Sequence, residues 1–357
     1  MKMMTGLITI LALSPLVLSC VATTPAFRDE RGRILPASVA RMQYVELGGS
    51  RQWICVRGES VDKPLLLILH GGPGTPEILP FRRYDAGLEK DFIVVNWDQR
   101  GSGKSYSPSM TADSMTIEQI LSDAHELVGS LKQSFGKDKI YLLGHSWGTI
   151  LGALLASRYP EDFHAYIGMG QWVTMGDNER LCYEFTRNEA ERRGDRKAVA
   201  LLERIGAPEN GLYRGDWLES LRAQRKYLKK YGGFLYGKSG VLDLHFGSYL
   251  RTTEYRDFSI SSYFKAELFC VRALWPEMAN VDLSRDAATI GTSVFLFLGR
   301  HDGNTPPSLA QAWLSGISAP SKGILWFEDS AHCPSFEEPA KFMAALARIS
   351  HNEPLPE

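Results

Sequence analysis

The stretch IYLLGHSWG, residues 140–148, decides the fold. Residues 140–143 form a continuous apolar run, as expected of a strand that is buried on both faces. A G-x-S-x-G pattern centred on Ser146 follows at once, and a helical pattern continues over residues 147–158. This order of strand, tight turn and helix predicts that the turn projects the Ser146 hydroxyl, while the flanking glycines relieve crowding. The sequence therefore predicts a nucleophilic serine at the carboxyl end of a buried strand.

Strand-like and helix-like segments alternate on both sides of this stretch, which predicts an α/β fold with a mostly parallel sheet and flanking helices. The glycines between the first two strand segments indicate a hairpin. The expected strands are residues 42–47, 52–57, 65–69, 92–97, 140–143, 165–170, 293–298 and 324–327. The expected core helices are residues 117–131, 147–158, 306–315 and 337–349, the first with a capping box at Thr116 and Gln119 and a stop at Gly136.

The alternation breaks in the middle of the chain. Residues 173–287 are rich in Arg, Glu, Tyr and Leu, with helix-like stretches near 178–205 and 216–230 and no buried strand run. The simplest interpretation is one α/β core, residues 42–172 and 288–350, interrupted by a helical cap that covers the site.

A second motif, HGGPG at residues 70–74, directly follows the third expected strand. Acyl transfer builds an oxyanion, and a glycine loop lets backbone N–H donors approach it closely. We expect the amides of Trp147 and Gly72 to be these donors, with Gly71 as the alternative to Gly72. His70 is predicted to be structural rather than catalytic.

Two further residues complete a predicted triad, each just past an expected strand. Asp302 follows the strand over 293–298, and His332 follows the strand over 324–327. The order Ser, Asp, His is that of α/β-hydrolases. His332 would take the Ser146 proton, while Asp302 would hold the His332 tautomer and stabilise the imidazolium.

Other side chains compete for these roles. His301 and Asp329 lie in the same two loops as the expected acid and base, and His145 adjoins the serine. We expect His145 to pack inside the turn, because it points the opposite way when the serine points outward. His301 is an alternative next to Asp302, and Asp329 is expected to be a loop carboxylate without a catalytic role.

A phosphate-binding loop is excluded. Residues 101–105, GSGKS, end like a P-loop, but that motif needs a glycine where this chain has Asp98. The stretch DQRGSG, residues 98–103, instead follows a strand and is expected to brace the active-site loop.

The motifs HGGPG, DQRGSG and GHSWG, together with the late His332, resemble the prolyl iminopeptidase-like branch of the α/β-hydrolases. The resemblance covers residues 42–172 and 288–349. It implies a helical cap over the site and the release of N-terminal residues, often proline, from small peptides. Carried over residue by residue, it implies a triad of Ser146, Asp302 and His332, with Gly72 and Trp147 as oxyanion donors.

The chain also departs from this branch. Prolyl enzymes usually have GGSWGS, whereas His145 and Thr149 stand at the positions of the second Gly and the second Ser. In the family, cap glutamates hold the free amine of the substrate; the candidates here are Glu184, Glu254 and Glu267. The residues themselves thus indicate a serine hydrolase, and the resemblance adds the aminopeptidase activity.

The functional hypothesis is therefore a serine hydrolase that works through an acyl-enzyme, with an aminopeptidase on small peptides as the first interpretation. An esterase, amidase or lactonase acting on a small molecule is the alternative, and a non-catalytic binding protein on this fold is the third. Lys plus Arg is 40 and Asp plus Glu is 41, so no charge excess indicates a nucleic-acid partner. No metal-ligand spacing occurs, and we expect neither a metal nor a cofactor.

The N-terminus has the pattern of an export signal. Lys2 is followed by an uncharged apolar run over residues 6–21, which is shorter than the ~20 residues of a comfortable membrane span. The run includes VLSC, which resembles the lipobox of bacterial lipoproteins, where Cys20 becomes the lipidated N-terminus. We predict a signal over residues 1–20, a tether over residues 21–41 and a lipoprotein on the periplasmic or extracellular side of a membrane. Soluble export is the alternative.

Four other cysteines remain: Cys55, Cys182, Cys270 and Cys333. An oxidising compartment would allow Cys182 and Cys270, both in the cap segment, to form a disulfide. Buried free thiols are the other interpretation, and we favour it.

Substituting Cys20 tests the predicted anchor. Cys20→Ser should release the protein from the membrane fraction or block its processing, because more than one acyl chain is needed for stable anchoring. Fractionation followed by N-terminal analysis of the mature protein checks this. A wild-type protein found wholly in the soluble fraction, with a mature N-terminus other than Cys20, would contradict the prediction.

Overall fold

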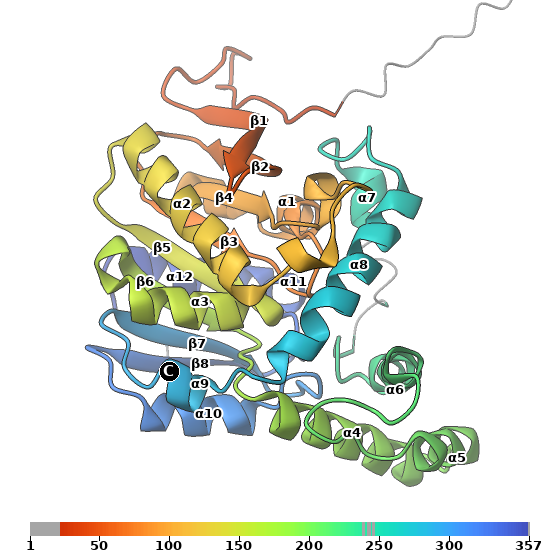
Figure 1. Cartoon of the computed structure of the whole chain (residues 1–357). Coiled ribbons are helices and arrows are strands. Elements are labelled where there is room, and N and C mark those ends of the chain that lie inside the picture. Colours follow the sequence, from red (N-terminus) through yellow and green to blue (C-terminus); the bar gives the residue numbers. More distant parts are fainter. Residues whose placement is uncertain (1–21, 238–239, 241–243, 245–246, 356–357) are drawn as a thin grey trace, which may run out of the picture.

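One twisted sheet forms the centre of the molecule (Figure 1). The computed structural model describes residues 22–237, 240, 244 and 247–355. Within these residues the sheet has eight strands in the order β1-β2-β4-β3-β5-β6-β7-β8. The strands are β1 Val39–Leu47, β2 Ser50–Gly58, β3 Leu65–Leu69, β4 Ile93–Asp98, β5 Ile140–His145, β6 Phe163–Met169, β7 Ser293–Gly299 and β8 Lys322–Phe327.

The sheet is antiparallel only at one edge. β2 pairs antiparallel with β1 and β4, whereas every pair from β4 to β8 is parallel. The hairpin turns between Leu47 and Ser50, as its two glycines predict. The predicted mostly parallel α/β sheet is therefore confirmed. The carboxyl ends of the parallel strands lie at one edge of the sheet, and this edge carries the loops that hold the predicted site residues.

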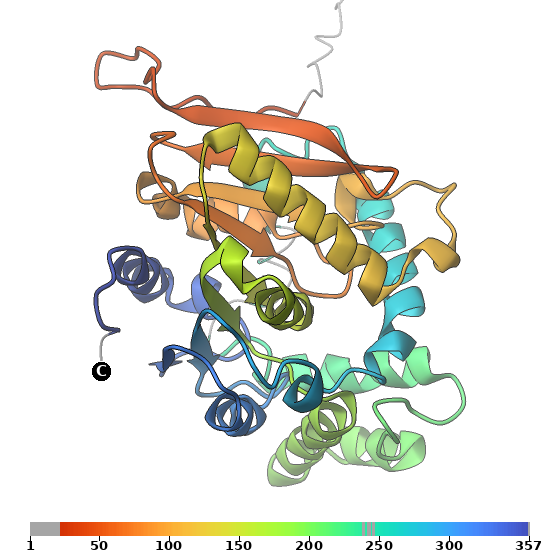
Figure 2. The same cartoon turned by 60° about the vertical axis from the view of Figure 1, so that its left-hand side comes forward.

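Helices cover both faces of the sheet (Figures 1 and 2). On β3, Leu65, Leu67 and Leu69 belong to the same apolar cluster as residues of α2, α3 and α10. The alternate residues Leu66 and Ile68 instead belong to the cluster formed with α1, α11 and α12. Neighbouring residues of a strand face opposite sides, so a strand buried on both faces must be apolar throughout. These helices are α1 Ile78–Tyr84, α2 Ile117–Phe135, α3 Trp147–Arg158, α10 Pro307–Gly316, α11 Pro334–Glu337 and α12 Pro339–Ser350.

The ends of α2 follow the sequence signals in large part. The Thr116 hydroxyl accepts a hydrogen bond from the Gln119 amide at 3.1 Å, and Gly136 ends the helix with φ of 60°. The Gln119 side chain donates to Asp123 at 2.9 Å instead of returning to Thr116. Only half of the predicted capping box is thus formed.

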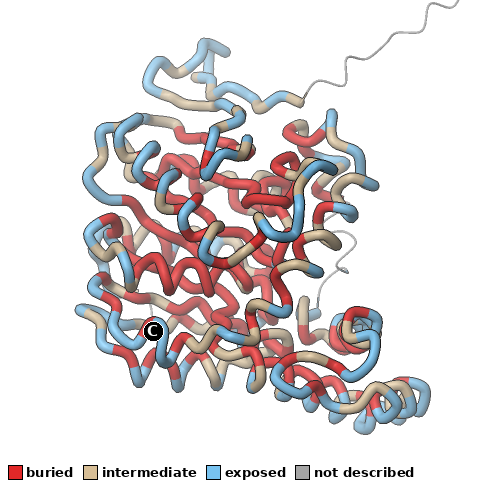
Figure 3. The backbone as a smooth tube through the Cα atoms, in the orientation of Figure 1, coloured by how far each residue is buried: buried red, intermediate tan, exposed pale blue. Residues whose placement is uncertain are grey.

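The segment between β6 and β7 is helical, as the sequence predicts, and covers one end of the sheet (Figure 1). Its helices are α4 Met175–Arg192, α5 Arg196–Ile205, α6 Trp217–Lys230, α7 Ser248–Arg251, α8 Ile260–Met278 and α9 Leu283–Asp286. Their outer surfaces are exposed, whereas burial concentrates on the sheet and its inner helices (Figure 3). Helix α8 was not predicted, although its buried residues Ala266, Cys270, Leu274 and Met278 recur every four positions.

The described chain begins close to the core. Arg57 donates to the Pro25 carbonyl at 2.6 Å and to the Thr24 hydroxyl at 2.5 Å. Part of the expected tether therefore packs on the domain. The predicted signal segment and Cys20 lie outside the described residues, so the lipid anchor stays a prediction.

The cysteines of the described chain are buried free thiols, namely Cys55, Cys182, Cys270 and Cys333. The favoured interpretation is confirmed, and Cys182 and Cys270 do not form the alternative disulfide. Among the described residues, the structure contains no helix with the length and apolar character needed to cross a membrane.

Candidate active site

Ser146 occupies a strained turn between β5 and α3. Its φ of 53° and ψ of −118° are rarely adopted by a residue with a side chain, and its amide donates to the Met169 carbonyl at 2.9 Å. A Cβ at Gly148 would lie 2.0 Å from the Leu69 carbonyl oxygen, and one at Gly144 would lie 2.5 Å from the Gly148 oxygen. Gly148 therefore allows α3 to approach β3, Gly144 allows α3 to approach β5, and this close packing positions Ser146.

His332 and Asp302 meet at the ends of β8 and β7. His332 Nδ1 and Asp302 Oδ2 are 2.9 Å apart, and each side chain is only 2% exposed. Three donors hold the carboxylate: the amides of Asn304 and Thr305, both at 2.8 Å, and the Thr305 hydroxyl at 2.7 Å. The pair is thus built into a fixed, almost water-free corner.

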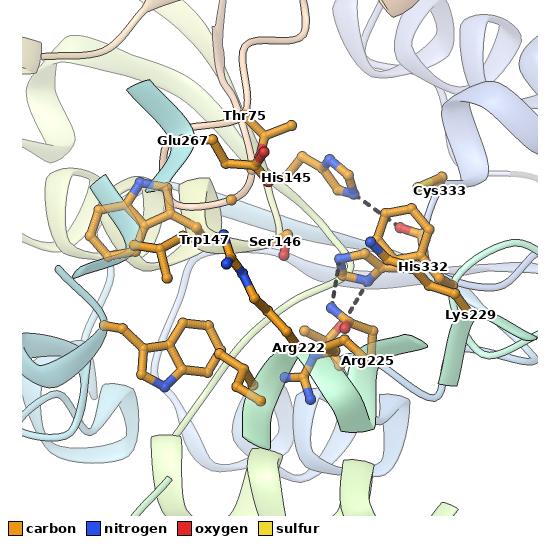
Figure 4. A pocket seen from close by; sticks show the side chains of 18 of the residues that line it. Thr75, His145, Ser146, Trp147, Arg222, Arg225, Lys229, Glu267, His332 and Cys333 are labelled. Carbon is orange, nitrogen blue, oxygen red and sulfur yellow. Dashed lines mark hydrogen bonds between the residues drawn. The ribbon is translucent and has the colours of Figure 1, made fainter. Parts of the chain in front are cut away.

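The hydrogen bonds assign the tautomer of His332. With its Nδ1–H donating to Asp302, the lone pair lies on Nε2, which accepts from the Asn304 side-chain amide at 3.1 Å. Burial lowers the pKa of His332 below its ordinary value, although the Asp302 carboxylate acts in the opposite direction. Figure 4 shows the Ser146 hydroxyl pointing into the space beside the His332 ring. The arrangement can supply a neutral base next to a hydroxyl.

The competing side chains are exposed or have other partners. Asp329 is exposed, and His301 stacks on Tyr236 with ring centroids 3.5 Å apart. His145 is buried inside the turn, where Nδ1 lies 2.5 Å from Glu77 and Nε2 lies 3.0 Å from the His332 carbonyl. Burial alone would lower the pKa of His145, but the Glu77 carboxylate more than offsets this and the pKa is raised.

The DQRGSG segment braces the HGGPG loop. The Gln99 side chain donates to the His70 carbonyl at 3.1 Å and accepts from the Trp147 indole at 2.9 Å. The Gln99 amide also donates to His70 Nε2 at 3.1 Å. Burial lowers the pKa of His70 to about 4, which fits a neutral structural ring. The predicted bracing role therefore matches the contacts.

The glycine loop lies directly against the serine. A Cβ at Gly71 would come 3.3 Å from the Ser146 Cβ, and both Gly71 and Gly72 line the cavity above it. Trp147 is the first residue of α3, so its amide has no partner within the helix. All three candidate oxyanion donors are thus brought around Ser146.

A cavity of about 880 Å³ opens over these residues and extends beneath the cap. This volume suits a small molecule or a short peptide. The cap contributes α4, α6 and α8 to its walls, with aromatic and aliphatic side chains prominent. Its polar lining includes Thr75, Asn178, Asn304, Glu267, Arg222 and Lys229 (Figure 4).

Of the three glutamates singled out in the sequence, one faces this cavity. Glu267 of α8 lines it, and burial raises the pKa of Glu267 despite the opposing effects of Lys229 and Arg222. Glu184 is half exposed and paired with Arg180. Glu254 is buried, but at 2.8 Å from Arg82, away from the cavity lining.

These features fit a known family. A family model described as the alpha/beta hydrolase fold matches residues 64–339 of the chain. The chain belongs to the α/β-hydrolase family. This α/β-hydrolase is 34% identical over 311 residues to the probable aminopeptidase YbaC of Bacillus subtilis, across 87% of this chain and 96% of that protein.

Two proline iminopeptidases are also similar to this α/β-hydrolase. The enzyme of Heyndrickxia coagulans is 26% identical over 314 residues, across 85% of this chain and 96% of that protein. The crystal structure of the Mycobacterium smegmatis enzyme matches with a TM-score of 0.61 and 19% identity, over 87% of this chain and 98% of that one. The predicted resemblance to the prolyl iminopeptidase-like branch is confirmed, and the similarity to a probable aminopeptidase supports a hydrolase.

Sequence reasoning missed several side chains of this α/β-hydrolase site. Asn304 and Thr305 follow the aspartate at the spacing of an Asx turn, a signal that could have identified them. Glu77 follows the glycine loop with no distinguishing pattern. The basic residues Arg222 and Lys229 lie on α6, where charged side chains are usually solvated.

The turn around Ser146 gives a stability test. Gly148→Ala should lower the free energy of unfolding by about 2 kcal/mol or more, because its methyl group would strike the Leu69 carbonyl of β3. The matched control is Gly129→Ala, in the exposed middle of α2 with no atom within 4 Å of the added Cβ, which should stabilise by about 0.5–1 kcal/mol. Chemical denaturation measures both. Equal effects would contradict the close approach of α3 to β3.

Proposed function

We propose that this α/β-hydrolase is a serine hydrolase in which Ser146 is the nucleophile, His332 the general base and Asp302 the orienting acid. The observation that carries the proposal is the buried contact of 2.9 Å between His332 Nδ1 and Asp302, in the same cavity wall as a serine held at a φ of 53°. A strained serine beside a histidine and a carboxylate is the arrangement of an activated nucleophile.

The reaction uses these groups in turn. His332 Nε2 takes the proton of Ser146 while the Ser146 oxygen bonds to the substrate carbonyl carbon, whose oxygen becomes an oxyanion. The amides of Trp147 and Gly72, or Gly71, donate to that oxygen. The carbonyl re-forms as the bond to the leaving group breaks, and the proton on His332 passes to the leaving group. Water then attacks the acyl-enzyme by the same steps and releases the acid product.

An aminopeptidase on short peptides is the activity that we propose. The support is Glu267, a carboxylate that projects from the cap into the cavity near Thr75 (Figure 4), together with the similarity to a probable aminopeptidase and to proline iminopeptidases. Above its raised pKa, Glu267 is an anion in a poorly solvated wall. A substrate ammonium group would be the natural partner of such an anion.

Replacing the serine tests the assignment. Ser146→Ala should abolish labelling by a fluorophosphonate probe and lower kcat on aminoacyl-naphthylamides by roughly 10⁴-fold or more, because the triad acts as a unit. Ser130→Ala, an exposed serine on α2, is the matched control and should leave both unchanged. More than a tenth of the wild-type rate in Ser146→Ala would overturn the proposal.

Two aspartate variants test which carboxylate is the acid of the triad. Asp302→Asn should cripple the enzyme by removing the acceptor of the His332 Nδ1 proton, whereas Asp329→Asn in the exposed loop should be close to wild type. The reverse result would mean that the acid is wrongly assigned. Activity on aryl esters without activity on aminoacyl-naphthylamides would favour the esterase alternative.

The pH profile should reflect the lowered pKa of His332. Only neutral His332 can accept the proton, so kcat/KM should fall as the solution becomes acidic, with a midpoint below the ordinary histidine value of about 6.5. A neutral aryl ester is the substrate for this measurement, because it carries no amine that would also report Glu267. A midpoint above 6.5 would contradict the burial effect.

A further inference from the structure

Helix α6 lines the cavity with basic side chains. Their spacing of three and four residues places them on neighbouring turns of the helix. The basic residues that line the cavity from this helix are Arg222, Arg225, Lys226, Lys229 and Lys230. The carboxylates that line it are Glu77, Glu179 and Glu267. The positive charge at the cavity thus exceeds the negative charge.

Some of these charges are already satisfied. Arg225 lies 2.5 Å from Glu179, and Lys230 lies 2.6 Å from Asp195. The Glu77 carboxylate is paired with His145, whose Nδ1 lies 2.5 Å from Glu77 Oε1. These pairs account for two of the three carboxylates and two of the five cations.

Three cations remain without a charged partner, and the one remaining carboxylate, Glu267, accepts a hydrogen bond from the Thr75 side chain. In the part of the chain that the structure describes, Arg222, Lys226 and Lys229 form no hydrogen bond or salt bridge. Arg222 and Lys229 both influence the titration of Glu267, yet neither approaches it within salt-bridge distance. Acid and bases therefore face one another across open space that a ligand can fill.

Lys229 lies on the histidine side of this space. Its ammonium nitrogen is 5.3 Å from the centre of the Phe234 ring, and that ring is 5.3 Å from the His332 ring. Figure 4 shows Lys229 near His332 and Cys333, whereas Arg222, from an earlier turn of the same helix, extends toward Ser146. His332 hands its proton to the leaving group, so we infer that the leaving group binds on the side of the cavity where Lys229 lies.

An unpaired ammonium in this position indicates an anionic ligand. Burial lowers the pKa of Lys229, although the Glu267 carboxylate acts in the opposite direction. A substrate carboxylate would offset this effect of burial with charge-assisted hydrogen bonds, and a guanidinium such as Arg222 adds a planar donor pair. A substrate that carried only a free amine would leave this excess of positive charge unmatched.

We propose that Lys229, assisted by Arg222, binds a carboxylate on the leaving residue of the substrate, so that the enzyme prefers short peptides with a free carboxylate beside the scissile bond. This inference rests on the proposed function and names its substrate class. The carboxylate can come from the C-terminus of a dipeptide or from an acidic side chain in the second position. In either case the amine faces Glu267 and the carboxylate faces α6.

Three peptides with the same first residue distinguish the possibilities. The first residue is the one that wild-type enzyme releases fastest from a panel of aminoacyl-naphthylamides. The peptides are the dipeptide Xaa-Ala, its amide Xaa-Ala-NH₂ and the amide Xaa-Asp-NH₂, each assayed for kcat/KM. We expect the wild-type enzyme to prefer a free carboxylate over Xaa-Ala-NH₂ by about tenfold or more, as a charged hydrogen bond implies. The acidic peptide with the higher kcat/KM shows whether the enzyme recognises the C-terminal carboxylate or the side-chain carboxylate.

Two neighbouring lysines make the matched variants. Lys229→Met should reduce the preference to near unity, because it removes the charge that contacts the substrate carboxylate. Lys230→Met removes the same charge from the next residue, whose ammonium is tied to Asp195, and should keep the wild-type preference. Arg222→Gln should reduce the preference in part.

The outcomes separate this inference from the proposed function. Equal rates for acid and amide in the wild type, or equal loss in Lys229→Met and Lys230→Met, would overturn the carboxylate site while fluorophosphonate labelling of Ser146 persists. Absence of labelling in the wild type would overturn the proposed function itself. Protection of Ser146 from labelling by the free-acid peptide, but not by its amide, gives a binding readout that needs no turnover. An enzyme that labels but shows neither cleavage nor protection also overturns the inference.

Discussion

The contact between the first turn of α3 and the end of β3 is the constraint on which the site depends. Because a Cβ at Gly148 would lie 2.0 Å from the Leu69 oxygen, two backbones meet there with no room for a side chain. Ser146 must therefore leave β5 in a strained conformation, and buried packing on both faces of the sheet sustains that strain. The same contact brings the amide of Trp147 next to the glycine loop that follows β3, so nucleophile and candidate donors are fixed together.

A buried polar network connects the glycine loop to more distant parts of the core. Arg100 forms hydrogen bonds of 2.6 and 2.9 Å with Asp123 and also binds the carbonyls of Leu47 and Gly48. It thereby joins the β1–β2 hairpin, α2 and the DQRGSG segment, whose Gln99 in turn holds the glycine loop. Removing one partner would leave an uncompensated buried charge, which costs far more than the intact pair contributes. The loop can be rich in glycine and still be rigid, because its order comes from neighbours rather than from its own residues.

Much of the core and its site followed from the sequence, for a physical reason. Strands buried on both faces must be continuous apolar runs, and parallel strands deliver their following residues to one edge, so Ser146, Asp302 and His332 could be placed by position alone. No comparable rule applies to the cap, so its cavity-facing residues could not be placed from the sequence. Its helices carry many charged residues, α8 was not predicted, and in the sequence the basic face of α6 looks like that of any solvated helix. Only the tertiary structure shows that Lys229 turns inward, and that Glu254 is held by Arg82 while Glu267 faces the cavity.

The division between core and cap has a physical consequence for specificity. The groups proposed for bond breaking stand on strand ends whose geometry the sheet dictates, so their positions tolerate little variation. The charged groups of the cavity stand on α6 and α8, which pack mainly against other helices, so their polar residues can change without disturbing the sheet. Glu267 and Lys229 carry opposite charges, and burial works against the ionised form of both. A ligand that carries both complementary charges would therefore offset the desolvation of Glu267 and of Lys229 at once. Selectivity then arises from the separation of the two charges along the ligand, a length that the positions of α6 and α8 determine.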